Sequence, residues 1–305
     1  MKDVLIIGKT GRLGKEFISQ LGAHKVTAIG RSDVDLTQLS HLAFYLRNNP
    51  HRVVINCAAF NGMEACLNNP GRAIIHNNAV PAVMASVLAE QRSLFVHFST
   101  DYAITGDAPV TKQTENSDGN PCSIYGFSKR QGEEAVKAYA TDYLIFRVAS
   151  IYGDDLEGSL SPVRNFLAGR KDLSDNKVLH QYTTPTSVRQ IVKSTRAAIQ
   201  AYLKQGGSSF SGLYHLVPEG PVWKHDFGRV ALKLYLDEDV PQLLCGQLAL
   251  PRPVYSLLDN TKFKSTFNIT LPTVWEDLYE SARLWRRKTG RSPLPPCTQY
   301  TPKLA

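Results

Sequence analysis

The stretch Val4-Leu5-Ile6-Ile7-Gly8-Lys9-Thr10-Gly11-Arg12-Leu13-Gly14 carries the strongest indication of the fold of this chain. Its apolar run predicts a buried strand, and the glycine-rich turn that follows opens a helix. Glycines let a backbone turn tightly and approach a pyrophosphate, and a helix N-terminus offers free N–H groups and positive dipole character. The spacing Gly-x-x-Gly-x-x-Gly in this context favours a dinucleotide-binding turn over an ordinary strand-to-helix turn.

Beyond this turn, short β-branched runs alternate with helix-compatible segments. We expect strands at 4–7, 26–29, 53–55, 94–98 and 144–146, and helices at 13–21, 78–90 and 128–140. Strands that alternate with helices imply βαβ units and a parallel sheet covered on both faces. The predicted fold is therefore α/β, a Rossmann-type doubly wound parallel sheet with a smaller α/β C-terminal substrate lobe.

The regular alternation loosens after about Gly153, where a polar stretch rich in Gly and Ser begins. We therefore expect an NAD(P)-binding Rossmann domain over residues 1–153, completed by the helical segment around 185–204. The small substrate-binding lobe is expected over 154–184 and 205–305.

The composition is ordinary for a globular protein of 305 residues, with 43% hydrophobic and 20% charged residues. No apolar run approaches the roughly 20 residues that span a bilayer, and the N-terminus lacks a signal peptide's long apolar region. The five scattered cysteines indicate reduced thiols, with no disulfide framework or zinc site. The net charge of +8 favours anionic ligands, but its dispersal argues against nucleic acid. We expect a cytoplasmic protein with neither nucleic-acid nor membrane partners.

The residues after the second and third expected strands refine the cofactor prediction. Arg31 stands where an NAD-selective site usually carries an acid, so it favours NADPH with its 2′-phosphate. Asp33 and Asp35 also lie within reach of a ribose, which leaves NADH open, and Asp35 alternatively belongs to a helix cap. The cofactor-binding residues predicted are Gly8, Thr10, Gly11, Arg12, Leu13, Gly14, Arg31, Asp35, Leu36, Cys57, Ala58, Ala59, Tyr125 and Lys129.

Tyr125 and Lys129 are four residues apart, so on a helix both side chains lie on one face. An ammonium beside a phenol favours the phenolate and lowers the tyrosine pKa, and such a tyrosine can exchange a proton with a carbonyl or an alcohol. Thr100, at the end of the fourth strand, can hydrogen-bond the same carbonyl. A tyrosine and a lysine with this spacing often occur by chance on a solvated helix, so the pair is a weak signal by itself. Thr100 is a weak signal by itself as well. Together they predict the catalytic residues Thr100, Tyr125 and Lys129.

The chain resembles the extended short-chain dehydrogenases/reductases, and most of all the dTDP-4-dehydrorhamnose reductase family. The motifs that carry the resemblance are the glycine turn, Asn56-Cys57-Ala58-Ala59, Ser99-Thr100-Asp101-Tyr102 and Tyr125-x-x-x-Lys129, in that order. The match extends over nearly the whole chain, to about Leu278. It implies hydride transfer from NAD(P)H to the C4 ketone of a nucleotide-linked 6-deoxy-hexulose.

The resemblance also implies roles for individual residues. Tyr125 would donate the proton, Lys129 would hold the nicotinamide ribose, and Thr100 would orient the carbonyl. The substrate-binding residues implied or inferred are Thr100, Asp101, Tyr102, Ser150 and Arg252. The guanidinium fork of Arg252 suits a substrate phosphate, and a structural salt bridge is an equal alternative.

Departures from the family pattern lie near the substrate and leave the sugar and the nucleotide open. Ser150 stands where rhamnose-forming enzymes usually carry a tryptophan. Tyr102 stands where the related 4,6-dehydratases carry the glutamate that removes water. An epimerase of the same fold and a non-catalytic NADP-binding subunit, like that of methionine adenosyltransferase, stay open as alternatives. Glu16 matches a glutamate found at a metal-bridged dimer interface in some members, but its partners are not recognisable, so we expect no metal and leave a homodimer open.

Overall fold

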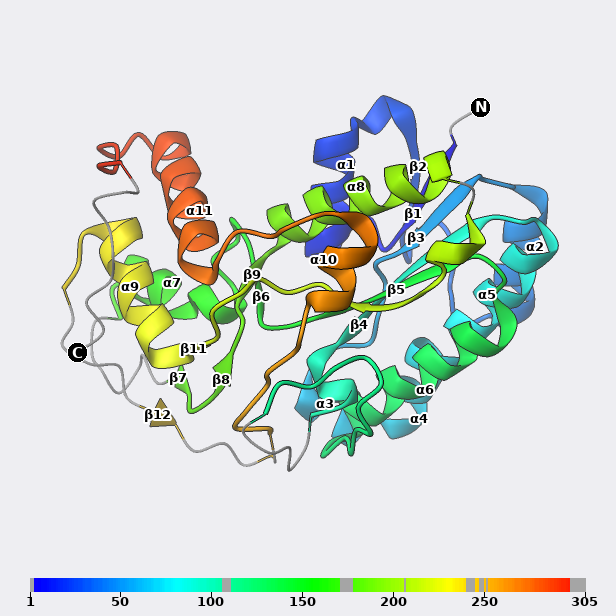
Figure 1. Cartoon of the computed structure of the whole chain (residues 1–305), viewed down its shortest axis with the longest axis horizontal. Coiled ribbons are helices and arrows are strands. Elements are labelled where there is room, and N and C mark those ends of the chain that lie inside the picture. The colour runs from blue at the N-terminus through cyan, green and yellow to red at the C-terminus, as the bar shows by residue number, and fades with distance from the viewer. Residues whose placement is uncertain are drawn as a thin grey trace.

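The computed structural model describes residues 3–105, 111–170, 178–205, 207–239, 245–246, 250 and 252–296. At its centre is a six-stranded sheet of order β10-β5-β4-β3-β1-β2, in which all neighbouring strands are parallel (Figure 1). Its strands are β1 (Val4–Ile7), β2 (Val26–Ile29), β3 (Val53–Asn56), β4 (Leu94–Thr100), β5 (Tyr143–Val148) and β10 (Gly212–His215). The predicted doubly wound parallel sheet is confirmed.

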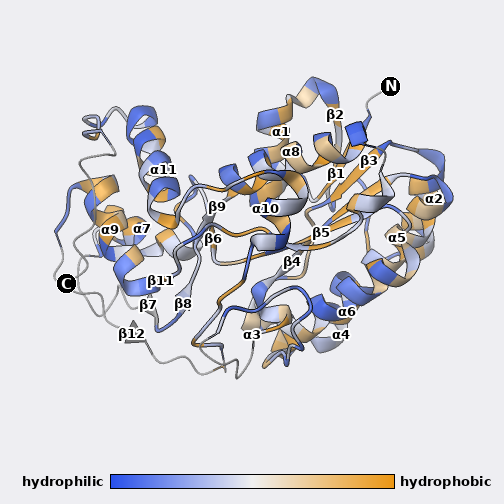
Figure 2. Ribbon diagram, in the orientation of Figure 1, coloured by the Kyte–Doolittle hydropathy of each residue, from blue (hydrophilic) through white to orange (hydrophobic). Residues whose placement is uncertain are grey.

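Helices cover both faces of this sheet because successive strand side chains alternate between the two faces. Ile6 belongs to one apolar cluster with Phe17 and Ile191, whereas its neighbour Leu5 belongs to another with Met84. The first face carries α1 (Arg12–Leu21), α8 (Val188–Gln205) and α10 (Thr261–Phe267), and the second α2 (Leu39–Asn48), α5 (Val80–Glu90) and α6 (Ile124–Tyr139). Figure 2 shows the apolar strands between helices that are hydrophilic on their outer sides.

A smaller lobe lies beside the sheet, on the left in Figure 1, and has its own apolar cluster around Tyr152, Phe227 and Trp285. Its helices are α7 (Ser161–Leu167), α9 (Lys224–Leu236) and α11 (Val274–Lys288). Three two-stranded sheets complete it: β11 (Val222–Trp223) with β8 (Tyr182–Thr183), β12 (Cys245–Gly246) with β7 (Val178–Leu179), and β6 (Ile151–Tyr152) with β9 (Thr186–Ser187).

Short helical turns connect the main elements. They are η1 (Ala23–Lys25), α3 (Met63–Asn68), α4 (Pro70–Ile74), η2 (Ile75–Ala79), η3 (Asp101–Ala103), η4 (Gly158–Leu160) and η5 (Ser208–Phe210). The segment η2 is a π-helix that runs directly into α5, so the long helix expected from residue 78 is interrupted by a wider turn at its start.

Strand β10 lies in the central sheet, although its residues fall within the range expected for the small lobe. It pairs in parallel with β5 after the chain crosses over through α8, and Leu213 lies opposite Ile145. A run of a few apolar residues carries no signal of the strand it will pair with, which is why the sequence pattern missed this. The proposed division of the chain into two domains stays a prediction.

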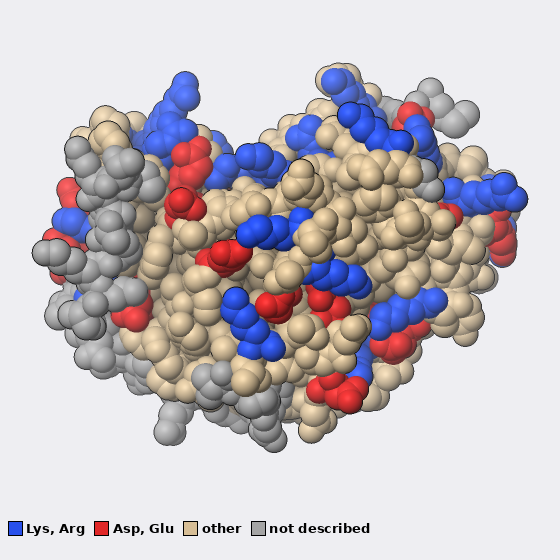
Figure 3. All heavy atoms as spheres, in the orientation of Figure 1, with Lys and Arg blue, Asp and Glu red and all other residues tan. Residues whose placement is uncertain are grey.

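The helices are relevant to the prediction about membranes, and the surface charge is relevant to the prediction about nucleic acid. In the described part of the chain, no helix is both long and apolar enough to cross a membrane. On the face shown in Figure 3, Lys and Arg side chains alternate with Asp and Glu and do not gather into one large patch. This distribution agrees with the dispersed charge read from the sequence.

Candidate active site

A cavity of about 830 Å³ opens at the carboxyl ends of β1, β3 and β4. The strand order reverses between β1 and β3, and ligands of open α/β sheets bind at such a switch point. The predicted site residues that line the cavity are Thr10, Gly11, Arg12, Leu13, Cys57, Ala58, Ala59, Tyr102, Tyr125, Lys129 and Arg252. The fold therefore brings the glycine turn and the tyrosine–lysine pair, which are far apart in the sequence, into one cavity.

The glycine turn fits the pyrophosphate of a dinucleotide. Gly8 has φ +95°, and a Cβ there would lie 2.8 Å from the backbone nitrogen of Ala58. A Cβ on Gly14 would lie 2.2 Å from the carbonyl oxygen of Gly8, so both positions require glycine. Helix α1 begins at Arg12 behind Gly11, which supplies no side-chain cap, so the first N–H groups of the helix stay available to an anion.

We predict that Gly14→Ala weakens NADPH binding by about ten- to a hundredfold, because the methyl group must push the turn away from its present path. The matched control is Gly71→Ala in α4, where an added Cβ meets nothing within 4 Å. Calorimetric titration with NADPH checks both variants. Wild-type affinity in Gly14→Ala would contradict the assignment of this turn to the cofactor.

The residues after β2 lie outside the lining of the cavity. The Asp35 carboxylate accepts a 3.0 Å bond from the backbone N–H of Thr37 and a 2.7 Å bond from the Thr37 hydroxyl, so it caps a local turn. Leu36 is buried against the core. The Asp33 carboxylate lies 2.6 Å from the Lys9 ammonium, a hydrogen bond that lowers its pKa. Arg31 is exposed. The cofactor roles of Arg31, Asp35 and Leu36 stay predictions.

Tyr125 lies in the first turn of α6. That helix begins one turn earlier than expected because the Ser123 hydroxyl accepts a 3.1 Å bond from the Gly126 N–H and caps it. The Tyr125 ring packs edge-on against Tyr102, with centroids 6.2 Å apart. Burial raises the pKa of Tyr125, and hydrogen bonding with Thr100 offsets part of that effect.

Lys129 lies on the same face of α6 as Tyr125, but its ammonium contacts other groups. It donates a 2.6 Å bond to the carbonyl oxygen of Phe98 and lies 3.4 Å from Nε2 of His97. Burial lowers the pKa of Lys129 to about 8. The expected lowering of the tyrosine pKa is therefore absent from the structure: burial dominates at Tyr125, and the lysine extends toward the end of β4.

Thr100 and Asp101 are buried behind Tyr125 and do not line the cavity. The Thr100 hydroxyl donates a 2.8 Å bond to Oδ1 of Asp101, while the Ser256 hydroxyl donates to the other carboxylate oxygen. The Thr100 oxygen accepts a 3.3 Å bond from the Tyr102 N–H, and the hydrogen bond between Thr100 and Tyr125 lowers the pKa of the phenol. In this geometry Thr100 orients the tyrosine, and direct contact of Thr100 or Asp101 with a substrate stays a prediction.

Ser150 adopts a backbone conformation that is strained for a residue other than glycine. Its φ is +45°, just beyond the end of β5, and its hydroxyl lies 3.3 Å from that of Thr183. Such strain is concentrated at functional sites. Ser150 nevertheless lies outside the lining of the cavity, so its contact with a substrate stays a prediction.

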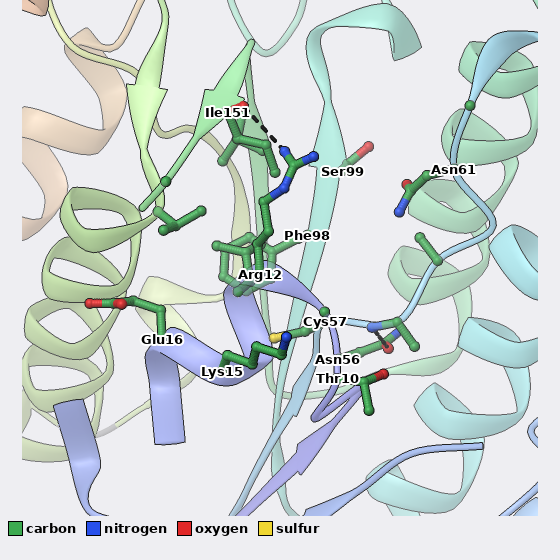
Figure 4. Close-up of a pocket in the computed structure, with 18 of the residues that line it drawn as sticks. Thr10, Arg12, Lys15, Glu16, Asn56, Cys57, Asn61, Phe98, Ser99 and Ile151 are labelled. Atoms are coloured by element: carbon green, nitrogen blue, oxygen red, sulfur yellow. Dashed lines mark hydrogen bonds between the residues drawn. The ribbon is translucent and has the colours of Figure 1, made fainter. Parts of the chain in front are cut away.

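Arg12 connects the glycine turn to the small lobe, a link that the sequence did not predict. Its Nε lies 2.8 Å from the Asp155 carboxylate, and Nη1 donates a 3.4 Å bond to the carbonyl oxygen of Ile151. Figure 4 shows this arginine rising from the turn toward Ile151 above Cys57. Both Arg12 and Asp155 line the cavity, and no local pattern around residue 155 indicates their pairing.

Asn77, in the π-helix η2, is a second residue that sequence reasoning missed. Its side-chain oxygen accepts from the Phe60 N–H at 2.9 Å, and its nitrogen donates to the Ser128 hydroxyl at 2.9 Å. The amide thus ties the segment after β3 to the residue beside Lys129. The available signal was a pair of asparagines, Asn77 and Asn78, interrupting an otherwise apolar helical segment.

Glu16 lines the cavity and accepts a 2.7 Å bond from the Gln20 side chain. Among the residues that the structure describes, no three histidine, cysteine or carboxylate side chains form a group able to hold a metal ion.

The chain is similar to known proteins along most of its length. The family model described as the RmlD substrate binding domain matches residues 1–285. A dTDP-4-dehydrorhamnose reductase from Burkholderia thailandensis is 28% identical over 285 residues, covering 88% of this chain and 94% of its own length.

Solved structures of dTDP-4-dehydrorhamnose reductases have a fold similar to that of this chain. A dTDP-4-dehydrorhamnose reductase from Clostridium acetobutylicum is 29% identical with a TM-score of 0.79, and the match covers 93% of this chain and 99% of that one. The fold is also similar to that of the Bacillus anthracis dTDP-4-dehydrorhamnose reductase in complex with NADP, which is 23% identical with a TM-score of 0.79 and matches over 92% and 98% of the two chains.

Proposed function

Because this chain belongs to the RmlD family, the dTDP-4-dehydrorhamnose reductases, we propose that it is an oxidoreductase that uses NADPH to reduce the C4 ketone of a nucleotide-linked 4-keto-6-deoxy-hexose. One observation carries the proposal. A single cavity at the switch point of the sheet holds both the glycine turn and the Tyr125 side chain, with Thr100 hydrogen-bonded behind the phenol. A cofactor and a carbonyl bound there would meet at the tyrosine.

The residues of the chain supply the proton and its placement. When bound, NADPH supplies the hydride that the ketone carbon accepts. The carbonyl oxygen takes the Tyr125 proton, so the product is a secondary alcohol and the tyrosine is left to recover a proton from solvent. Burial holds the pKa of Tyr125 above its usual value, so the phenol keeps this proton until negative charge develops on the carbonyl oxygen. We propose that the Lys129 side chain holds the nicotinamide ribose of the cofactor.

Tyr102 argues against dehydration at this site. A 4,6-dehydratase uses a glutamate at this position as its base. Burial raises the pKa of Tyr102 to about 12, so its hydroxyl stays protonated at neutral pH. The side chain lies beside Tyr125 and lines the cavity, which suits contact with the sugar.

The proposed reaction is tested by following the near-ultraviolet absorbance of NADPH with a panel of nucleotide-linked 4-keto-6-deoxy sugars. We expect oxidation with at least one sugar and a reduced sugar among the products. NADPH that binds tightly and is oxidised with none of them would favour the epimerase or the regulatory subunit. A homodimer stays a prediction, which light scattering in solution checks.

The cofactor preference depends on Arg31, which we place at the 2′-phosphate. We predict that Arg31→Ala raises the KM for NADPH about tenfold and leaves that for NADH unchanged, because a charge-assisted bond to the phosphate is lost. The control is Arg52→Ala, an exposed arginine just before β3, at the opposite end of the sheet from the cavity. Equal changes in the KM values for NADPH and NADH would show that Arg31 does not bind the 2′-phosphate.

A further inference from the structure

The lysine of the active site contacts a histidine that the proposed reaction does not use. His97 belongs to β4 and is fully buried, and its Nε2 atom lies 3.4 Å from the side-chain nitrogen of Lys129. Its other ring nitrogen, Nδ1, lies 3.1 Å from the side-chain nitrogen of Asn56 in β3. A neutral histidine carries its proton on only one ring nitrogen, so the partner of Nδ1 decides what Nε2 presents to the lysine.

The Asn56 amide determines where the His97 proton lies. Its oxygen Oδ1 accepts a 3.0 Å bond from the backbone N–H of Ala58, so turning the amide round would set two donors against each other. The amide nitrogen can only donate, and Nδ1 of His97 must therefore accept from it. Burial holds the pKa of His97 well below its usual value, and the charge of Lys129 acts in the same direction, so the ring is neutral. The single ring proton is thus on Nε2, which faces Lys129.

Lys129 consequently meets one acceptor and one donor at the end of β4. Its nitrogen donates a 2.6 Å bond to the carbonyl oxygen of Phe98, while the Nε2–H of His97 lies against the same nitrogen. An ammonium has no lone pair and cannot accept from that N–H, whereas a neutral amine can. Burial lowers the pKa of Lys129 to about 8, and a donor facing the nitrogen favours the neutral form as well.

The other charges around Lys129 do not cancel this effect. Glu133, one turn further along α6, favours the ammonium, but its carboxylate already accepts bonds from Arg147 and from the Ser99 hydroxyl. The titratable or charged side chains on the elements packed against α6 include Glu64, Cys66, Arg72, His76, Glu90, His97, Asp101, Tyr102, Tyr143 and Arg147. Burial outweighs Glu133, since the pKa of Lys129 is lowered.

We propose that His97 is a positioning residue for Lys129: its Nε2–H, oriented by Asn56, holds the lysine nitrogen at the carbonyl oxygen of Phe98 and favours the neutral amine. The inference rests on the proposed function, in which Lys129 holds the nicotinamide ribose, and extends it to the control of the charge on that lysine. A charged donor makes a stronger hydrogen bond than a neutral one. Turnover should therefore decline as the pH rises through the pKa of Lys129, and His97 helps to set that upper limit.

The first measurement follows the charge of Lys129 directly, by NMR titration of the full chain with isotope-labelled lysine side chains. The Lys129 signal is identified by its absence from Lys129→Met, and in the wild type it should titrate near pH 8. His97→Asn keeps an acceptor for Asn56 but is too short to contact the lysine, so the midpoint should rise by about one pH unit. His97→Gln, whose amide oxygen can accept from the ammonium, should raise it at least as far. The control is His41→Asn, at an exposed histidine of α2, which should leave the midpoint unchanged.

The second measurement is the pH profile of kcat/KM for NADPH with the preferred sugar, which reports groups that titrate in the free enzyme. Wild-type activity should fall as the pH rises above about 8, where Lys129 loses its proton. In His97→Asn this fall should move upward by the same amount as the NMR midpoint. A residue that only supports the fold would lower activity at every pH and leave the position of the fall unchanged.

The outcomes separate this inference from the proposed function. A His97→Asn midpoint equal to that of the wild type would overturn the role of His97 and leave the reductase proposal standing. An NMR midpoint that moves while the activity profile stays in place would overturn the effect of His97 on the reaction. A wild-type protein that turns over no sugar at any pH, with Lys129 titrating as expected, would overturn the proposed function alone. If His97→Asn does not fold, His97→Gln takes its place under the same criteria.

Discussion

Replacing Tyr125 with phenylalanine should lower the rate of NADPH oxidation by about a hundred- to ten-thousandfold, the usual contribution of a general acid. The substitution removes one oxygen and keeps the ring that packs against Tyr102. The cavity keeps its shape, so the affinity for NADPH should stay within about twofold of the wild type. The measurements are single-turnover oxidation with the preferred sugar and a calorimetric titration with NADPH.

The control for this variant is Tyr139→Phe, at the last residue of the same helix, where the side chain is 56% exposed. It should oxidise NADPH at the wild-type rate. A Tyr125→Phe enzyme that keeps more than about a tenth of the wild-type single-turnover rate would identify another group as the acid. In that case the Thr100–Tyr125 contact would be structural.

Arg147→Met should lower the free energy of unfolding by about 3–5 kcal/mol, because it leaves the Glu133 carboxylate buried without its partner. The two side chains are almost wholly buried and form a two-pronged pair, with nitrogen–oxygen distances of 2.9 and 2.6 Å. The Ser99 hydroxyl donates to the same carboxylate, and Ser99 lines the cavity at the end of β4. Loss of the pair should therefore reach the active site as well as the core. Urea unfolding followed by circular dichroism measures the effect.

Two further variants make this prediction specific. Arg47→Met breaks an exposed pair with Glu90 whose two bonds are each 3.0 Å long, and it should change stability little because water screens that pair. Arg147→Met combined with Glu133→Leu should recover part of the loss, since no buried charge is then left alone. Equal destabilisation by Arg147→Met and Arg47→Met would show that burial does not determine how much an ion pair contributes to the free energy of unfolding.

Much of the sheet could be read from the sequence because each strand is a short β-branched run followed by a turn. The limits of β1 and β2 agree with the prediction, whereas β4 continues two residues further, through Thr100. That difference arises because pairing with β5 carries the strand past its apolar residues, up to the pair Thr100 and Val148. The start of α6 was missed by one turn because Ser123 caps it, a bond that depends on backbone geometry more than on residue pattern.

The amino-acid pattern alone accounts for the glycine turn, for the order of strands and helices along the chain, and for the spacing of Tyr125 and Lys129. These features follow from local sterics and from the periodicity of neighbouring residues, so a short stretch of chain carries each of them. Three relations depend on the tertiary structure: the direction in which Lys129 extends, the bond from the Thr100 hydroxyl to Asp101, and the pairing of Arg12 with Asp155. Those relations join segments distant along the chain, and they depend on burial and on the pairing of strands, which no single segment specifies.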